Sequence, residues 1–377
     1  MKNSNFPLPA GIDGGETSSR PLSLDALGFT AAEAAQLAAL DPPARPARVA
    51  RVDGPLAHVL DPTGEHLAAI PGRLRGDPER APAVGDWVAL RDTSQGEAVV
   101  VDVLDRRTRI ARAAAGARAR VQVIAANVDR VFVVMGLDGD FNPRRLERYL
   151  TICGDAGADA VVLLTKAAAC ADVDAKIEAC RRVAGAPFVL GIHAIDVIDG
   201  VAPEVPRTYI ESGMTIALVG SSGAGKSTLV NHLLGGARMA TAAVREGDDR
   251  GKHTTTHREL IVLPGGGLLI DNPGMRELAL WLDADGLRRA FADVDALAGG
   301  CRFRDCSHGH EPGCAVRQAV DDGLLDEARL TSFDRLQREV EATERRRDER
   351  RRRADDRQQG KLYRRIARER QRRRGER

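Results

Sequence analysis

Aromatic side chains and long apolar segments are both scarce in this sequence. Phe, Trp and Tyr make up 3% of its 377 residues. A core must therefore be built mainly from Ala, Val and Leu, and a wide surface for stacking nucleic-acid bases is not expected. No apolar run approaches the roughly 18 residues that a membrane-spanning helix needs, and residues 1–15 lack the apolar centre of a signal peptide. These absences predict a cytoplasmic protein that has no membrane partner.

Cysteine is also rare, and half of it lies in one short segment. Three of the six cysteines gather there beside two histidines: Cys301, Cys306, Cys314, His308 and His310. In a reducing cytosol such a cluster indicates a metal site rather than disulfides. Three thiolates and one imidazole are the ligand set of a closed, structural Zn²⁺ site, and the spacing alone leaves either histidine open as the fourth ligand. Free buried cysteines and a redox role are the alternatives.

The small net charge of +2 hides two very different parts of the chain. Residues 345–377 contain 17 Lys and Arg against 6 Asp and Glu, which makes that tail about +11 and leaves about −9 for everything before it. Such density favours contact with nucleic-acid phosphates, which positions a protein without reading sequence. A solvated helix is the alternative interpretation of the same residues.

The pattern of apolar residues divides the chain into five segments. Residues 1–45 are rich in Ala, Pro and Gly, and we expect a flexible extension with one short helix. In residues 46–115, short stretches of alternating apolar and polar residues are separated by turns of Gly, Pro and Asp, which is typical of a small all-β barrel. From 121 to 282, continuous apolar strands alternate with helices, which predicts a parallel sheet covered on both faces. A helical segment that holds the cysteine cluster follows at 283–345, and the basic tail occupies 346–377.

Arginines gather just beyond the last predicted strand of the barrel segment, at Arg106, Arg107, Arg109 and Arg112. The composition leaves two interpretations of the barrel open. It is either a packing module or an OB-fold that binds RNA.

Residues 220–228 read GSSGAGKST and match the phosphate-binding pattern GxxxxGK[ST]. The apolar segment TIALVG before them and the helical segment after them supply the strand–loop–helix context that the motif requires. Its glycines let backbone N–H groups surround phosphate oxygens, while Lys226 supplies a charge to the outer phosphates and Ser227 a hydroxyl to Mg²⁺. The residues expected to contact the nucleotide are Gly220, Ser221, Ser222, Gly223, Ala224, Gly225, Lys226, Ser227 and Thr228.

Two further segments suit a nucleotide-dependent switch. Asp271 ends an apolar strand, where a carboxylate can hold Mg²⁺, and the backbone N–H of Gly274 can meet the terminal phosphate. Between this DNPG segment and the phosphate loop lies a threonine-rich segment, in which Thr254 and Thr255 are candidates for a second Mg²⁺ hydroxyl. The order of phosphate loop, threonine segment and DxxG is typical of a GTPase.

The residue that orients the attacking water is not where many small GTPases carry it. Met275 follows Gly274 at the position of a water-orienting glutamine, and a thioether cannot orient water. His253 is the candidate for that catalytic role beside Lys226, unless a partner macromolecule positions the water.

The loop that specifies guanine normally follows DxxG, and here no such pattern follows Asp271. The nearest match is Thr165-Lys166, which ends the apolar segment VVLLTK upstream of the phosphate loop. The order of motifs is therefore permuted. All strands of a P-loop sheet can still be present when the original ends are joined and the chain is cut elsewhere.

With this order the sequence resembles the RsgA/YjeQ family, the circularly permuted GTPases that act in maturation of the small ribosomal subunit. The segments that carry the resemblance span about residues 47–377 and include VGDWV, AANVDRVFVV, DFNPRRLERYL, GSSGAGKSTLVNHLLG, GKHTTTHREL, DNPGMREL and CRFRDCSHGHEPGC. The resemblance implies a multidomain fold with an amino-terminal OB-fold barrel, a permuted α/β P-loop GTPase domain and a carboxy-terminal helical zinc-binding domain.

The same resemblance implies a GTPase whose hydrolysis of GTP to GDP, with Mg²⁺, is stimulated by the ribosome. We expect the protein to be a monomer. Its partners would be the small ribosomal subunit and its rRNA. The family pattern also favours His308 over His310 as the ligand that completes one structural Zn²⁺ site with the three clustered cysteines.

The sequence departs from the family pattern in the base pocket. The guanine-reading aspartate falls on Ala168, and Ala194-Ile195-Asp196 replaces the serine-alanine turn near the base. Losing two charge-assisted hydrogen bonds costs about 2–4 kcal/mol, so weak base selectivity is expected unless a backbone carbonyl or Asp172 takes over the contact. The rival functions are a P-loop kinase or ATPase for a small molecule, and a non-catalytic RNA-binding module. The intact Lys226 argues against the second.

Overall fold

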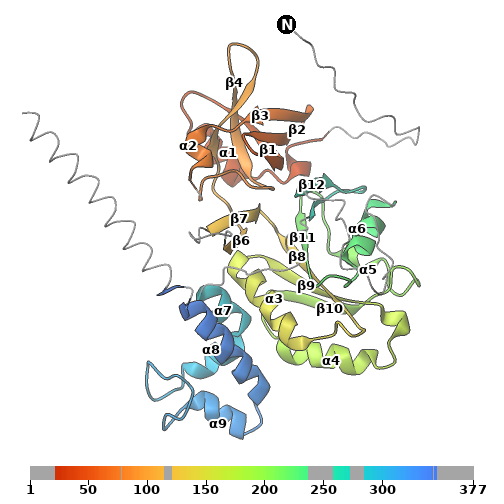
Figure 1. Cartoon of the computed structure of the whole chain (residues 1–377), viewed down its shortest axis with the longest axis vertical. Coiled ribbons are helices and arrows are strands. Elements are labelled where there is room, and N and C mark those ends of the chain that lie inside the picture. The colour runs from red at the N-terminus through yellow and green to blue at the C-terminus, as the bar shows by residue number, and fades with distance from the viewer. Residues whose placement is uncertain are drawn as a thin grey trace, which may run out of the picture.

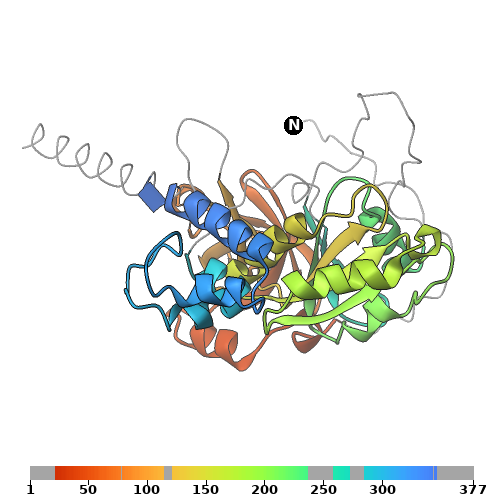
Figure 2. The same ribbon diagram turned by 90° about the horizontal axis from the view of Figure 1, so that it is seen from below.

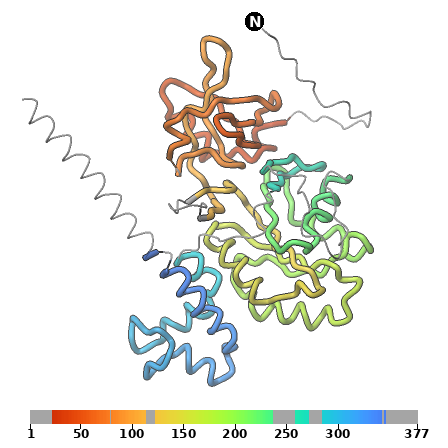
Figure 3. The backbone as a smooth tube through the Cα atoms, viewed as in Figure 1, coloured from red at the N-terminus to blue at the C-terminus, as the bar shows by residue number. Residues whose placement is uncertain are grey.

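The computed structural model describes residues 22–77, 79–113, 121–236, 258–271, 284–342 and 344–345. Within this part of the chain three regions follow one another: a closed barrel, a six-stranded sheet with helices on both faces, and a group of helices that holds the cysteine cluster. Figure 1 shows the barrel at one end and the carboxy-terminal helices at the other, with the sheet between them, and Figure 3 traces the same course of the backbone.

The barrel has five strands in the order β1-β2-β3-β5-β4. Its strands are β1 (Arg45–Asp53), β2 (Leu56–Asp61), β3 (Gly64–Ala69), β4 (Trp87–Asp92) and β5 (Ala98–Val103), and the short helix α2 (Gly72–Arg75) connects β3 to β4. Small and β-branched side chains such as Ala47, Val49, Val59 and Val88 fill the interior. The barrel predicted from the turn spacing is confirmed, and its core is as poor in aromatic residues as the composition requires.

The segment before the barrel is built into the fold, contrary to the expected flexible extension over 1–45. Of that extension the structure describes residues 22–45, which form η1 (Asp25–Leu27) and α1 (Ala31–Ala38). Leu27 is fully buried, and the ring of Phe29 packs edge-on against Trp87 at 4.8 Å. The composition suggested an appendage because its many alanines hide the few large residues that anchor it.

The central sheet has the strand order β10-β9-β8-β11-β13-β12. Its strands are β8 (Arg130–Gly136), β9 (Asp159–Thr165), β10 (Val189–Ala194), β11 (Thr215–Val219), β12 (Glu259–Val262) and β13 (Leu268–Asp271). The first five in spatial order are parallel, as predicted, whereas β12 at the edge is antiparallel to β13. The connection from Val262 to Leu268 is too short for the crossover that a parallel pair needs.

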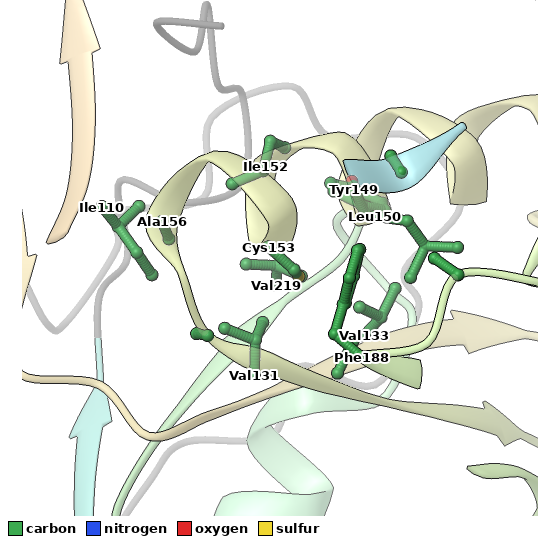
Figure 4. Packing of buried hydrophobic residues seen from close by; sticks show 14 of the residues in the cluster. Ile110, Val131, Val133, Tyr149, Leu150, Ile152, Cys153, Ala156, Phe188 and Val219 are labelled. Atoms are coloured by element: carbon green, nitrogen blue, oxygen red, sulfur yellow. The ribbon is translucent and has the colours of Figure 1, made fainter. Parts of the chain in front are cut away.

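Alternate residues of β8 face the two sides of the sheet. Val131 and Val133 point to the side that α3 (Pro143–Ala156) covers, and Figure 4 shows them below Leu150 and Cys153 of that helix. Phe132 and Val134 belong to the opposite core, to which α6 (Lys226–Leu234) contributes Leu229 and Leu233. The helices α4 (Val173–Val183) and α5 (Val205–Thr208) complete the two layers. This burial on both faces explains the continuous apolar runs of the strands.

A separate two-stranded sheet joins the barrel to the central sheet. It consists of β6 (Arg109–Ala113) and β7 (Val121–Ala126), which are antiparallel. The amide of Ala126 donates to the carbonyl of Val84, and this bond connects the pair to the turn before β4. The arginine content of residues 105–120 concealed this pair of strands.

The carboxy-terminal helices pack against α3 and not only against one another. They comprise α7 (Ala284–Ala290), α8 (Ala292–Ala298), α9 (Ala315–Asp321) and the helical residues 327–342. Figure 2 shows the last of these helices, in dark blue, beside α3. At Gly286 of α7 an added Cβ would lie 2.5 Å from the side chain of Asp155, so α3 and α7 approach closely. In the part of the chain that the structure describes, no helix combines the length and apolar character needed to cross a membrane.

Candidate nucleotide-binding site and metal centre

The phosphate loop lies between the end of β11 and the start of α6. Gly220 has φ +150°, and a Cβ there would stand 2.1 Å from the carbonyl oxygen of Val134 on β8. Gly223 and Gly225 have φ of +80° and +91°, in the left-handed region that side chains disfavour. These conformations place the loop at the amino terminus of α6, where backbone N–H groups and the helix dipole favour an anion.

Lys226 lies across the loop that precedes it. Its Nζ donates to the carbonyl oxygen of Gly220 at 2.6 Å and also to that of Ser221. The ammonium group is therefore held over the loop that the sequence assigns to phosphates. Ser227 follows in the first turn of α6, and Thr228 is the next residue of the same helix.

The end of β9 supports the phosphate loop from the side. Thr165 Oγ1 donates to the carbonyl oxygen of Ala224 at 2.7 Å, and the residue is only 8% exposed. This hydroxyl therefore binds the phosphate loop in the structure, whereas the sequence pattern places Thr165 in the loop expected to contact the base of GTP. Thr165 and Ala224 are 59 residues apart in the sequence, so the sequence did not predict this hydrogen bond.

Lys166 has a left-handed backbone, with φ +62°. Its Nζ lies 2.5 Å from Oδ2 of Asp138, in the loop between β8 and α3. Burial acts to raise the pKa of Asp138, but the hydrogen bond and charge of Lys166, together with hydrogen bonds from backbone amides, outweigh it and lower that pKa below its usual value. The base loop is thus connected to a second loop of the site through an ion pair that the sequence did not predict.

The two segments assigned to the base are neighbours in space. The amide of Ala167 donates to the carbonyl of Ile195 at 3.3 Å, and the amide of Ile195 donates to Leu164 at 2.8 Å. Ala168 is exposed in the 3₁₀ turn η2 (Ala167–Ala169) and presents only a methyl group. Asp172, the alternative acceptor, precedes α4 with an exposed side chain that makes no capping hydrogen bond.

Asp271 ends β13 at the same edge of the sheet as the phosphate loop. Strands β11 and β13 are parallel neighbours with Ala217 opposite Ile270, so both chains leave the sheet side by side. A carboxylate there and the hydroxyl of Ser227 suit the oxygen ligands that Mg²⁺ prefers. Four other predicted site residues lie outside the described part of the chain: His253, Thr254, Thr255 and Gly274.

The cysteine cluster converges on one point. One ligand atom from each of Cys301, Cys306, His308 and Cys314 lies within 4.8 Å of the other three. Nδ1 of His308 is 3.6 Å from the sulfurs of both Cys301 and Cys314, and the histidine is 7% exposed. His310, the other candidate from the spacing, is exposed. Three sulfurs and one imidazole nitrogen at these separations fit a tetrahedral metal ion.

Two of the remaining cysteines have unreactive thiols. Burial raises the pKa of Cys153 to about 12 and that of Cys180 to about 11. Both thiols therefore stay protonated at neutral pH, and a redox role has no support at these positions.

Two of the four arginines that follow the barrel are used inside the protein. Arg106 is bonded through Nε and Nη2 to the two oxygens of the fully buried Asp86, at 2.7 Å each. Arg107 pairs with Glu33 of α1 and with Asp129. These contacts explain part of the arginine-rich segment as packing rather than as a nucleic-acid surface.

Three comparisons place the chain among known proteins. A family model described as RsgA GTPase matches residues 103–281. The chain is 46% identical over 316 residues to a protein of Opitutus terrae named small ribosomal subunit biogenesis GTPase RsgA, across 80% of this chain and 85% of the other. It is 50% identical over 268 residues to the protein of the same name from Xylella fastidiosa, across 71% of this chain and 76% of the other.

Solved structures show the same fold at lower identity. YjeQ from Thermotoga maritima has a TM-score of 0.60 and 23% identity, and the match covers 78% of this chain and 98% of that one. YloQ, described as a circularly permuted GTPase, has a TM-score of 0.58 and 21% identity over 79% and 96% of the two chains. The order of base loop and phosphate loop agrees with that description. From the identity and coverage of its relatives, the chain belongs to the RsgA family of circularly permuted GTPases.

Proposed function

We propose that this protein is a cytoplasmic, monomeric GTP hydrolase that binds the small ribosomal subunit and its rRNA during subunit maturation. The relatives that carry this activity in their name match most of the chain. The observation that carries the proposal is the phosphate loop, which lies at the junction of β11 and α6 with the base segment beside it.

In the proposed site the backbone N–H groups of residues 220–228 hold the phosphates of GTP. Lys226, now bonded to the loop carbonyls, turns its charge to the outer phosphates. Ser227 and Asp271 would hold Mg²⁺, together with the hydroxyl of Thr254 or Thr255, and the bound ion would neutralise charge on the phosphates.

The hydrolytic step needs a group that orients water beside the terminal phosphate. His253 is the residue of this chain that we assign to that role, because an imidazole can accept the proton of water and Met275 cannot. We assign the backbone N–H of Gly274 to the terminal phosphate, as the DxxG pattern predicts. The helix α7 begins at Ala284, ten residues after Gly274. A shift of Gly274 on hydrolysis could therefore be transmitted through a short segment of chain to the carboxy-terminal helices.

We assign a structural role to the metal centre. One Zn²⁺ held by Cys301, Cys306, His308 and Cys314 leaves no open position for a substrate, and it ties down a segment between α8 and α9 that has little regular structure. The barrel and the basic tail contact rRNA in this proposal, the tail through phosphates alone.

The test is turnover of GTP and of ATP by the purified protein, with and without small ribosomal subunits. We expect slow GTP hydrolysis that small subunits accelerate. Absence of hydrolysis in both conditions would contradict the proposal and would support a non-catalytic RNA-binding module.

A second candidate function, a nucleoside triphosphatase with relaxed base choice, is favoured by one observation. Ala168 exposes a methyl group at the position of the family's guanine-reading aspartate. Equal turnover of ATP and GTP in the same assay would support this candidate.

A further inference from the structure

The short loop between β8 and α3 is held firmly by its neighbours. The amide of Asp140 donates to Oδ1 of Asp138 at 3.1 Å, and Nζ of Lys176 on α4 donates to the carbonyl of Leu137 at 2.7 Å. At the start of this loop, an added Cβ on Gly136 would meet Oδ1 of Asp138 at 2.5 Å. Because the loop is held by these bonds, a group that is hydrogen-bonded to one of its side chains is also fixed in position.

Asp140 in this loop bonds to the phosphate loop. Its Oδ2 accepts a hydrogen bond from the hydroxyl of Ser221 and another, at 3.3 Å, from the amide of Gly136. Its Oδ1 pairs with the guanidinium of Arg145 in the first turn of α3. The carboxylate is 16% exposed, so a single side chain joins β8, the phosphate loop and α3 with little competition from water.

The charges explain why Arg145 accompanies this aspartate. A carboxylate beside a site for nucleotide phosphates repels them unless its charge is balanced. Arg145 supplies that balance, and its own amide is held by the side chain of Asn142 at 3.1 Å, which caps α3. The arrangement therefore gives the phosphate loop a strong acceptor without adding net negative charge.

We propose that Asp140 is a positioning residue for the phosphate loop: it holds Ser221 so that the loop's backbone N–H groups converge on the phosphates, while Arg145 cancels its charge. This inference rests on the proposed GTPase function and concerns the same site. Thr165 supports the other end of the loop at Ala224, so the loop is held from two neighbouring strands.

The test compares GDP affinity, measured by titration calorimetry with Mg²⁺ present, in single and double variants. Ser221→Ala and Asp140→Ala should each weaken GDP binding about tenfold, the size expected for one hydrogen bond to a charged group. The double variant should bind GDP no more weakly than the weaker of the two single variants, because both substitutions remove the same hydrogen bond between Ser221 and Asp140. Asp140→Asn keeps an acceptor for the hydroxyl and should bind GDP like the parent.

The role of charge is tested with Arg145→Met, which leaves the carboxylate unbalanced. We expect weaker GDP binding in that variant and recovery when Asp140→Asn is added. The control is Asp174→Asn, which removes an exposed carboxylate in the first turn of α4. It should leave GDP binding unchanged. Ser221→Ala keeps the α3 cap intact and serves if Asp140→Ala fails to fold.

The outcomes separate this inference from the proposed function. A parent that neither binds GDP nor hydrolyses GTP contradicts the function. A parent that binds GDP, with Ser221→Ala unchanged or with losses that multiply in the double variant, overturns the role of Asp140.

Discussion

At the scale of single residues, we expect base choice to depend most directly on Ala168. It is exposed beside the 194–196 segment, and its methyl group cannot accept the two hydrogens of guanine N1 and N2. We expect the parent to distinguish GDP from ADP weakly and Ala168→Asp to raise that preference roughly 30- to 1,000-fold, from about 2–4 kcal/mol of restored hydrogen bonding. Competition binding of the two nucleotides measures it.

The result that would contradict this prediction is strong guanine selectivity in the parent that Ala168→Asp does not improve. In that case a backbone carbonyl, or Asp172 at the start of α4, makes the contact instead.

Lys226 is the residue whose loss should abolish GTP hydrolysis. It is the cation held over the phosphate loop by the carbonyls of Gly220 and Ser221. We expect Lys226→Ala to reduce GTP turnover at least about a hundredfold, because a charge-assisted contact to the outer phosphates disappears. Arg181→Ala, which removes an exposed cation on α4, is the control and should turn over GTP like the parent. Turnover of Lys226→Ala at the parent rate would show that the phosphates bind elsewhere.

At the scale of secondary structure, we expect residues 301–314 to depend on a metal ion held by the cysteine cluster. They connect α8 to α9 with turns rather than with a helix or strand. We expect elemental analysis to find about one zinc per chain, and Cys306→Ser or a chelator to lower the midpoint of thermal unfolding. Cys170→Ser, at a half-buried cysteine outside the cluster, should change neither quantity. A fully folded preparation that holds no metal would refute the assignment.

The contact between α3 and the carboxy-terminal helices includes a buried ion network. Arg329, 3% exposed, bonds to Glu147 of α3 at 3.1 Å and to Asp293 of α8 at 2.9 Å. Burial raises the pKa of Glu147, although hydrogen bonds oppose that rise. We expect Arg329→Met to reduce the free energy of unfolding by about 3–5 kcal/mol, because it leaves an unpaired buried carboxylate.

Urea unfolding measures this cost. Adding Glu147→Gln to Arg329→Met should recover part of the loss, since the orphaned charge is then removed. The control is Arg288→Met, which breaks an exposed pair with Asp285 and should cost less than about 1 kcal/mol. Equal costs for the buried and the exposed arginine would contradict the role given to the network.

Across the whole molecule, buried arginines join the three regions. Arg48 of the barrel is fully buried and donates to the carbonyl of Leu27 at 2.5 Å and to the hydroxyl of Thr215, at the start of β11, at 3.0 Å. Burial lowers its pKa to about 10, so it remains charged at neutral pH. The barrel is thereby attached to the strand that leads into the phosphate loop.

The charge of the whole molecule leads to a prediction about the tail, which lies outside the described residues. Removing residues 346–377 takes away a net charge of about +10 and leaves a chain of about −8. We expect weaker binding to small subunits or rRNA and a flatter dependence of log affinity on log salt concentration, because fewer counterions are released. An unchanged slope would show that the tail is merely solvated.

Short sequence motifs determined much of the secondary structure and of the candidate sites of this protein. The glycines and lysine of the phosphate loop, Asn142-Pro143 at the start of α3 and the apolar strand runs each specify their element through neighbours in sequence. The cysteine spacing likewise predicted three sulfur ligands, the family resemblance selected His308 as the fourth ligand, and these four ligand atoms do converge. Each of these features depends on backbone propensity, capping or burial within a few residues, which a sequence displays directly.

Only the tertiary structure decided which distant residues meet. The antiparallel edge strand β12 and the packing of Leu27 were not visible in the pattern. The bonds from Thr165 to Ala224 and from Ser221 to Asp140 join residues 59 and 81 positions apart. No periodicity encodes such pairs, because each is set by which strand ends lie side by side in the sheet, and that order follows from the packing of the whole chain.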